Sequence, residues 1–184
     1  MLWLEQVYFT INEYLLKMTG SADRLADRLV DIIFAEPLDC YIEVKYNRDN
    51  ELGSIRFIKR KENIEDIKTL QTTVELDEYF KGERESFSCN YDISGLSVFS
   101  RKVLNETKKI RYGRTITYSG LARNSGTRSA RAVGRALANN PIPIIIPCHR
   151  IIAKNGIGGY SGGLEIKTRL LEFERKHART FNVL

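Results

Sequence analysis

The residues best suited to covalent chemistry are Cys148 and His149, which are consecutive near the end of a proline-rich segment, residues 140–150. A thiol is a strong nucleophile only as a thiolate, and a neighbouring histidine or a positive local field lowers its pKa. Three of the four prolines of the chain lie in this segment, and because proline fixes φ, we expect the cysteine to be held rigidly. A turn at residues 147–150 could bring the thiol and the imidazole together, directly or through one water. The segment therefore predicts nucleophilic chemistry at a cysteine.

A carboxylate that could orient His149 lies on the last predicted helix, residues 164–177. A histidine base usually needs such an acceptor. Ile166 and Leu170 mark the inward stripe of this helix, and Glu174 takes the next position on it. Because a carboxylate on an apolar stripe is costly unless it is paired, we expect Glu174 to hold His149. The alternative is that the stripe frays and Glu174 is a surface acid.

A glycine-rich stretch, residues 156–163, separates the cysteine segment from this helix, and five of its eight residues are glycine. Glycine lets a backbone approach a ligand closely. Tyr160 and Ser161 lie at the centre of the stretch. A glycine-rich loop alone is weak evidence, but beside a Cys–His pair it predicts the wall of a pocket.

The elements upstream of the cysteine predict a helix–turn–helix. Thr117 can cap a short helix over residues 118–124, a turn follows at residues 125–127, and a longer helix spans residues 128–139. At about 100° per residue, the apolar side chains of the longer helix share one side and its arginines share the other. The arginine side comprises Arg128, Arg131 and Arg135, with the small Ala132 among them.

This longer helix contains no acidic residue, whereas solvated charged faces normally mix both signs. We therefore expect it to contact DNA; the alternative is a charged face that meets only water. The charge of the whole chain agrees, because residues 1–87 hold 12 basic and 18 acidic side chains and residues 88–184 hold 17 basic and 5 acidic ones. Such asymmetry indicates that the basic half meets a polyanion, although a basic surface without a partner is the alternative.

Residues 1–87, the acidic half of the chain, are predicted to form a small α+β unit. We expect a helix over residues 22–34, ended by Pro37, and a hairpin over residues 40–59. A second helix is expected over residues 64–81, and the alternating residues 87–94 place Phe87, Cys89, Tyr91 and Ile93 on one side. Residues 1–20 are ambiguous between strand and helix. Cys89 on this pattern is expected to be a small buried hydrophobic residue.

Composition narrows the class of protein. The chain has 184 residues, 42% hydrophobic and 28% charged, which excludes collagenous, low-complexity and disordered classes. No stretch approaches the roughly 20 apolar residues of a membrane span, and the first residues lack a basic n-region, so we expect neither a membrane segment nor a signal peptide. The three cysteines, Cys40, Cys89 and Cys148, do not suggest a disulfide scaffold, and no Cys/His group has zinc-ligand spacing.

Together these motifs resemble the O6-alkylguanine-DNA alkyltransferase family. The resemblance is carried by the Pro-Cys-His-Arg motif at 147–150 and the Asn-Pro-Ile-Pro-Ile-Ile-Ile segment before it. The Tyr-Ser-Gly-Gly-Leu motif at 160–164 follows in the family's order and spacing. Further matches are Tyr79 to Gly82, Thr117-Tyr118, Arg131 to Gly134, Lys167, Leu170-Leu171 and Glu174. The resemblance spans about residues 80–176.

The resemblance implies an α+β fold with two domains. Residues 1–92 would form a small RNase H-like domain, and residues 93–184 a winged-helix-like domain that carries the helix–turn–helix. It implies DNA repair by direct reversal, in which the protein transfers the alkyl group irreversibly from O6-alkylguanine, and also from O4-alkylthymine, to its own cysteine. Each molecule would act once.

For the chemistry, the resemblance implies that Cys148 attacks the alkyl carbon. His149 would deprotonate Cys148 through a water, and Glu174 would hold His149. Tyr118 would hydrogen-bond N3 of the flipped guanine, and Asn140 would brace the turn between the helix and the active site.

For binding, the resemblance implies that the backbone N–H of Ser161 bonds O6 and that Tyr160 lines the pocket. The carbonyls of Cys148 and Ile151 would accept from the exocyclic amine, and Arg131 would fill the gap left by the flipped base. Further contacts implied for base or DNA are Gly162, Thr117, Arg128, Ser129, Ala132 and Arg135.

The resemblance also implies a partner, double-stranded DNA containing O6-alkylguanine, and no membrane, cofactor or metal. Some members carry a zinc site in the N-terminal domain, but this chain has no histidine before His149, so we expect none. We expect a monomer in the cytoplasm, at the nucleoid of a prokaryote, or in the nucleus of a eukaryote. Two alternatives remain: a non-catalytic helix–turn–helix protein that recognises alkylated DNA, and a cysteine hydrolase with a Cys–His–Glu triad.

Overall fold

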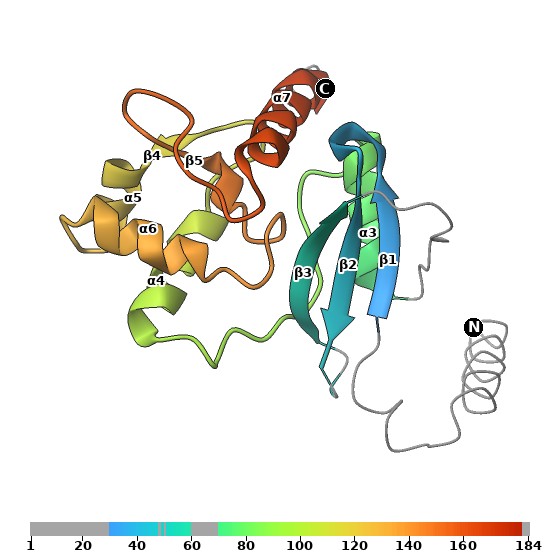
Figure 1. Ribbon diagram of the computed structural model, residues 1–184, viewed down its shortest axis with the longest axis horizontal. Helices are drawn as coiled ribbons and strands as arrows, with labels where there is room; N and C mark the ends of the chain where they lie inside the picture. Colours follow the sequence, from blue (N-terminus) through green and yellow to red (C-terminus); the bar gives the residue numbers. More distant parts are fainter. Residues whose placement is uncertain (1–29, 48, 50, 60–69, 182–184) are drawn as a thin grey trace, which may run out of the picture.

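The computed structural model of the chain describes residues 30–47, 49, 51–59 and 70–181. These residues form an α+β fold, as the sequence predicts: a three-stranded sheet with one helix comes first, and a group of helices follows (Figure 1). Helix α7 (Leu164–Phe181) lies against both parts, because it contacts the 3₁₀ turn η1 (Glu36–Leu38) and the 3₁₀ turn η2 (Cys148–Arg150). This helix therefore ties the sheet to the segment that carries Cys148.

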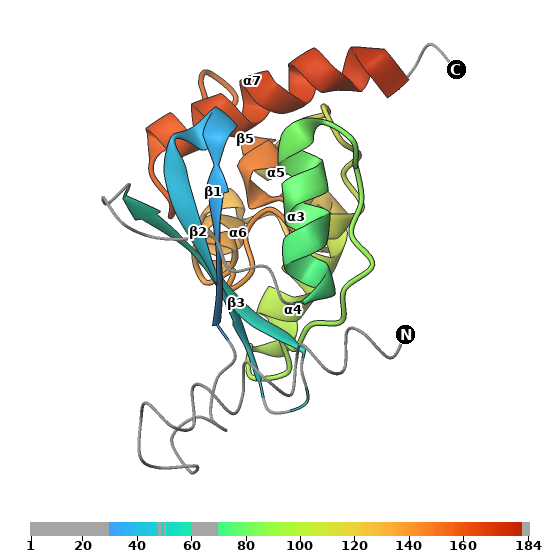
Figure 2. The same cartoon turned by 90° about the vertical axis from the view of Figure 1, so that its right-hand side faces the viewer.

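The sheet has three antiparallel strands in the order β1 (Val30–Ala35), β2 (Cys40–Tyr46) and β3 (Leu52–Lys59). Helix α3 (Gln71–Lys81) packs against it through β1 (Figure 2). Burial alternates strictly along β1 and β2, as expected where one face of a sheet lies on a core. The predicted hairpin over residues 40–59 is confirmed by the β2–β3 pairing.

The helix predicted over residues 22–34 is wrong where the structure describes it, because β1 is a strand there; the remainder of that prediction lies outside the described residues. Asp31 explains the error. Its carboxylate lies on the buried face of β1, where it accepts hydrogen bonds from the backbone N–H of Leu70 at 3.1 Å and the hydroxyl of Thr73 at 2.6 Å. An acid at an inward position breaks the apolar alternation that would have identified a strand.

The remaining predictions for the first half hold with changes. Helix α3 occupies the described part of the helix predicted over residues 64–81 and ends at Gly82, whose φ of 76° is the left-handed conformation typical of a helix end. The alternating side chains of residues 87–93 lie on the core side as expected, but they are only partly buried, including Cys89, which was expected to be buried. However, only Tyr91 forms a bridge to β3, so this segment is extended chain rather than a strand.

The helical part contains the predicted helix–turn–helix. The two helices of the motif contact each other, and a preceding helix packs on both. A serine or threonine caps each of the three helices, since Ser97, Thr117 and Ser129 accept a hydrogen bond from the N–H three residues on. Strands β4 and β5 pair in parallel beside them. The elements are α4 (Val98–Lys108), β4 (Ile116–Thr117), α5 (Tyr118–Asn124), α6 (Ala130–Ala138) and β5 (Ile151–Ile152).

Residues 82–97 connect α3 with α4, and the domain boundary at residue 92 stays a prediction. Within the described ranges, none of the helices has the length and apolar character needed to cross a membrane.

Candidate active site and nucleic-acid interface

The proline-rich segment ends in η2, whose three residues are all buried; Cys148 is 5% exposed. Ahead of this turn the backbone folds back, and the N–H of Ile146 donates to the carbonyl of Ile142 at 3.0 Å. Ile144, within the fold-back, has a φ of 76°. This is an outlier for a β-branched residue, and such strain persists only where the surroundings hold the backbone. Cys148 is thus presented by a backbone with little freedom.

Asn140 connects the end of α6 to the cysteine. Its side-chain N–H₂ donates to the carbonyl of Ile146 at 2.9 Å and to the Sγ of Cys148 at 3.1 Å, while its side-chain oxygen accepts from the N–H of Ile142 at 3.2 Å. Burial raises the pKa of the Cys148 thiol, and the bond from Asn140 opposes that rise because it favours the thiolate. The resting thiol is therefore protonated but has a donor already aimed at its sulfur.

Glu174 is the centre of a buried hydrogen-bond network. One of its oxygens lies 2.8 Å from Nε2 of His149 and accepts from the hydroxyl of Tyr79 at 2.8 Å. Arg150 donates to both oxygens from Nε, at 3.1 and 3.0 Å, and again from an Nη at 2.7 Å. The backbone N–H of Gly113 completes the set at 3.0 Å. The structure therefore brings Glu174 and His149 together, as the helix spacing predicts.

The network determines which groups are charged. Burial alone would raise the pKa of Glu174, but His149 and Arg150 hold it well below its usual range, so the carboxylate is ionised. Burial lowers the pKa of His149 in spite of that carboxylate, so the imidazole is neutral at rest. The ionised acceptor at Nε2 favours the tautomer with its proton on Nε2. Nδ1 is then a free acceptor; it is buried and has no hydrogen-bond partner among the described residues.

Cys148 opens into a cavity of about 810 Å³ between the helix–turn–helix and the glycine-rich loop. Tyr118 lines it and donates from its hydroxyl to the carbonyl of Gly159 at 3.1 Å. Tyr160 also lines the cavity, and its ring meets that of His149 edge-on. Five residues proposed from the sequence share this lining: Thr117, Tyr118, Cys148, Tyr160 and Ser161.

Two residues proposed to bind the substrate base, Ile151 and Gly162, lie outside this lining. Ile151 is fully buried, and its carbonyl accepts from the ammonium of Lys167 at 2.5 Å. Gly162 lies in the neighbouring groove, where an added Cβ would come within 2.8 Å of both Phe57 and Tyr160. A side chain at this position would push the loop away from β3 or into Tyr160, which is a reason for glycine here.

Sequence reasoning did not predict the contacts of Arg150, Lys167 and Tyr79. Arg150 and Tyr79 are partners of Glu174, and Tyr79 is 95 residues away from it along the chain. Lys167 is fully buried, and it joins the two sides of the glycine loop by donating to Ile151 and to Gly159. Burial lowers the pKa of Lys167 to about 8. Two signals for this lysine were its place among the residues that match the family and its position on the inward side of the last helix.

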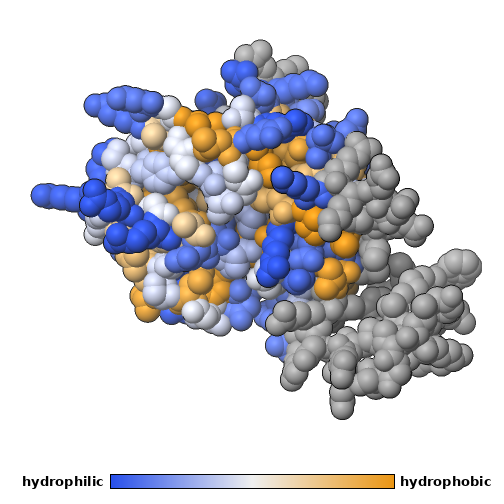
Figure 3. All heavy atoms as spheres, in the orientation of Figure 1, coloured by the Kyte–Doolittle hydropathy of each residue, from blue (hydrophilic) through white to orange (hydrophobic). Residues whose placement is uncertain are grey.

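The candidate nucleic-acid surface lies on α6. Its two arginines, Arg131 and Arg135, are exposed, and Ala132 is half-buried beside them. Arg128, which the sequence places in the helix, is also exposed but precedes the cap residue Ser129. Figure 3 shows hydrophilic side chains projecting from the face of the molecule at the α5–α6 end. The opposite side of α6 is apolar and buried in the core. Arg131 does not line the cavity of Cys148, but α6 does so through Ala130, Gly134, Leu137 and Ala138, so the arginine face adjoins the cavity.

In the described part of the chain, no group of three or more histidine, cysteine or acidic side chains could hold a metal ion. The three cysteines are free thiols.

Comparison with known proteins gives a consistent result. The family model for the DNA-binding domain of 6-O-methylguanine DNA methyltransferase matches residues 98–176. A methylated-DNA–protein-cysteine methyltransferase of Metallosphaera sedula is 46% identical over 99 residues, which are 54% of this chain and 63% of that protein. The match thus spans less than two thirds of that relative.

Two solved structures are similar over more of their length. The OGT protein of Mycobacterium tuberculosis, solved in complex with DNA, is 30% identical with a TM-score of 0.68, over 76% of this chain and 89% of that one. An O6-methylguanine DNA methyltransferase from Methanococcus jannaschii is 34% identical with a TM-score of 0.54, over 74% of this chain and 89% of that one.

Proposed function

Because the chain belongs to the O6-methylguanine DNA methyltransferase family, we propose that it repairs DNA by moving the alkyl group of O6-alkylguanine onto its own Cys148. One observation carries the proposal: the thiol opens into a cavity beside a basic helix–turn–helix, and it adjoins a histidine that an ionised, buried glutamate holds. A non-catalytic DNA-binding protein would not need a thiol that opens into this cavity.

Activation of the thiol begins at His149. Its free Nδ1 takes the proton of Cys148 through one water, and Glu174 stabilises the imidazolium that forms. Asn140 donates to the sulfur and so favours the thiolate over the thiol. The three residues thus supply a base, a counter-charge and a hydrogen-bond donor.

In the transfer step, the Cys148 sulfur attacks the alkyl carbon, an S–C bond forms and the C–O6 bond breaks. The electron pair of the broken bond stays on guanine, and the proton held on His149 balances its charge. Tyr118 hydrogen-bonds N3 of the guanine, and the N–H of Ser161 bonds O6; both residues line the cavity. The thioether product is stable, so the protein acts once. The same geometry accepts O4-alkylthymine.

Access requires that the base leave the duplex, since O6 cannot be reached inside the stack. The arginine face of α6 lies against the minor groove, and Arg131 fills the space of the extruded base. The DNA phosphates are contacted by Thr117, Arg128, Ser129 and Arg135. The protein works as a monomer. Damage repair needs little base readout, so these backbone contacts dominate affinity.

The function is tested by the stoichiometry of repair. A duplex with a single O6-methylguanine is mixed with the protein, and the methylated base that remains is measured against protein added. We expect one methyl group removed per protein molecule, none by Cys148→Ser, and an unchanged yield for the control Cys89→Ser. Removal of many groups per protein would show a turnover enzyme and overturn the proposal.

A further inference from the structure

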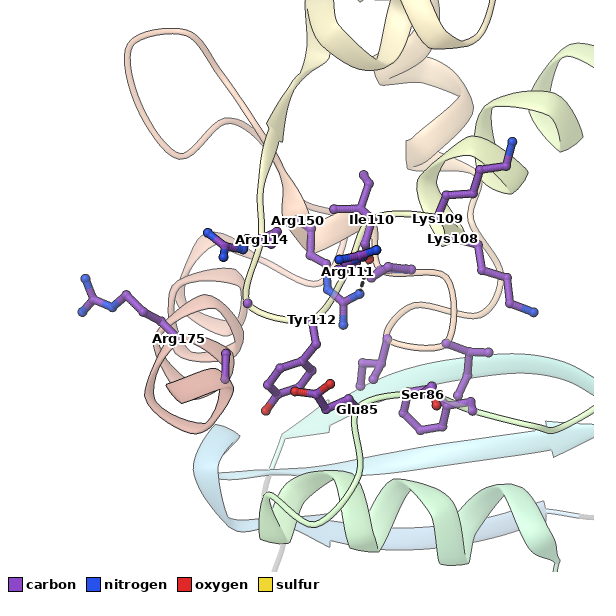
Figure 4. A pocket seen from close by; sticks show the side chains of 16 residues that line it. Glu85, Ser86, Lys108, Lys109, Ile110, Arg111, Tyr112, Arg114, Arg150 and Arg175 are labelled. Carbon is purple, nitrogen blue, oxygen red and sulfur yellow. Dashed lines mark hydrogen bonds between the residues drawn. The ribbon is translucent and has the colours of Figure 1, made fainter. Parts of the chain in front are cut away.

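A second cavity, of about 630 Å³, lies behind the active-site turn. It has no lining residue in common with the cavity of Cys148. The turn contributes to both cavities, because Cys148 lines the first whereas Pro147 and Arg150 line the second. Figure 4 shows this second cavity, which we call the basic cleft, between α7, the loop after α4 and residues 85–87 of the segment that follows α3.

The rim of the basic cleft is strongly cationic. Five exposed cations line it and only one acid, Glu85. Among the five, Lys109 pairs with Glu106 at 2.6 Å and Lys108 bonds the hydroxyl of Tyr91 at 3.1 Å. The other three, Arg111, Arg114 and Arg175, form no ion pair with any residue that the structure describes. Like charges around a concave surface repel one another and attract an anion.

The arrangement of these cations favours an extended anion. In Figure 4 the side chains of Lys108, Lys109, Arg114 and Arg175 point outward along the two sides of the cleft and do not converge on one point. Arg150, in the floor of the cleft, already donates hydrogen bonds from its guanidinium to Glu174 and to the carbonyl of Ile110. A single compact anion would meet few of these groups at once, whereas a chain of phosphates can meet them in succession.

We propose that the basic cleft is a second nucleic-acid site, which binds the phosphate backbone of a DNA segment other than the one held by α6. The two surfaces lie on different parts of the molecule: α6 is at the outer side of the helical part, and the cleft lies where α7 and the loop after α4 meet residues 85–87 (Figures 1 and 4). One protein molecule therefore holds two DNA segments. The inference rests on the proposed function only in assigning the first segment to α6.

The direct test is the number of duplexes bound per protein. The full chain is mixed at low salt with an excess of undamaged duplex of about ten base pairs, one helical turn, and sedimentation is followed at protein and DNA wavelengths. We expect two duplexes per wild-type molecule. We expect one for the triple variant Arg111→Glu, Arg114→Glu, Arg175→Glu.

A matched control carries the same change in net charge on the acidic half: Arg56→Glu, Lys59→Glu, Lys81→Glu. It should still bind two duplexes. Reaction with free O6-alkylguanine base, which needs no duplex, should proceed at the wild-type rate in both variants; this separates loss of the cleft from loss of the active site. If the glutamate variant does not fold, the glutamine version of the same three positions replaces it.

Three results overturn the inference: one duplex per wild-type molecule, equal loss of the second duplex in the cleft variant and the control, or retention of both duplexes in the cleft variant. A further experiment measures the binding of pyrophosphate at constant ionic strength. If the cleft variant loses pyrophosphate binding but keeps two duplexes, the ligand is a compact phosphate and the inference is wrong.

Discussion

At the scale of single residues, the most specific prediction concerns Asn140 and the reactivity of Cys148. Asn140 is the one side chain seen to donate to the Cys148 sulfur among the described residues. A hydrogen bond to a charged group contributes about 1.5–3 kcal/mol, so Asn140→Ala should lower the thiolate fraction, and the rate of alkyl transfer, by about tenfold to a hundredfold. The neighbouring Asn139, exposed at the end of α6, supplies the control Asn139→Ala. Thiolate absorbance against pH measures the shift; identical titrations in the two variants would refute it.

Glu174 has both a structural and a catalytic role, and two variants separate them. Glu174→Gln leaves the charge of Arg150 buried without its partner, which should destabilise the protein by about 3–5 kcal/mol in urea unfolding. The replacement is nearly isosteric, so the loss comes from the weakened bidentate contact with Arg150 rather than from packing. Adding Arg150→Gln should restore much of the stability without restoring the rate of transfer. Full recovery of the rate would show that Glu174 does not act through His149.

The buried His149 also predicts how stability changes with pH. Its pKa is lowered by burial, so the unfolded state takes up a proton at a higher pH than the folded state does. The contribution of His149 to the free energy of unfolding should therefore be fully present above about pH 6.5 and fall as the pH drops below it. Glu174, whose folded pKa is also lowered, adds a further loss as pH falls below about 4.3, the usual glutamate value. His149→Gln should flatten the decline between about pH 6.5 and 5; an unchanged decline in this variant would contradict the assignment.

At the scale of elements, α6 should separate DNA binding from chemistry. Arg131→Ala should slow repair in duplex DNA more than reaction with free O6-alkylguanine base, because only the duplex leaves a gap to fill. Arg135→Ala, one turn further along the same exposed face, should weaken binding and leave the reaction of bound DNA unchanged. Both rates are followed under single-turnover conditions. Equal losses on the two substrates for Arg131→Ala would mean that it does not occupy the gap.

The elements also show where sequence reasoning succeeds. The helix–turn–helix was predictable because its signals are local: caps at Thr117 and Ser129, and a single apolar side on α6. Helix spacing predicted that Glu174 faces inward, and its pairing with His149 was inferred because a buried carboxylate needs a partner and a histidine base needs an acceptor. The strand β1 could not be identified, because its inward acid Asp31 is satisfied by residues about 40 positions away. Within the site, the contacts of Glu174 with Tyr79 and Arg150 could not be predicted either, because they form only through tertiary packing.

At the scale of the whole molecule, charge controls affinity. The basic residues 88–184 should make binding to undamaged DNA fall steeply with salt and depend little on sequence. The log–log slope should be about −0.9 for each phosphate contacted in a duplex. Fluorescence anisotropy over a range of salt concentrations measures it. A flat response, or a strong preference for one undamaged sequence, would be inconsistent with binding through the backbone.

The central claim is that a single cysteine keeps the alkyl group, and peptide mapping by mass spectrometry tests it most directly. The protein is incubated with duplex DNA containing O6-methylguanine, its intact mass is measured, and a digest locates the change. We predict a gain of one methyl group per molecule, found entirely on Cys148, the thiol that lines the cavity beside Tyr118. Methylation of Cys40 or Cys89 instead, or repair of the DNA with no gain in protein mass, would contradict the account.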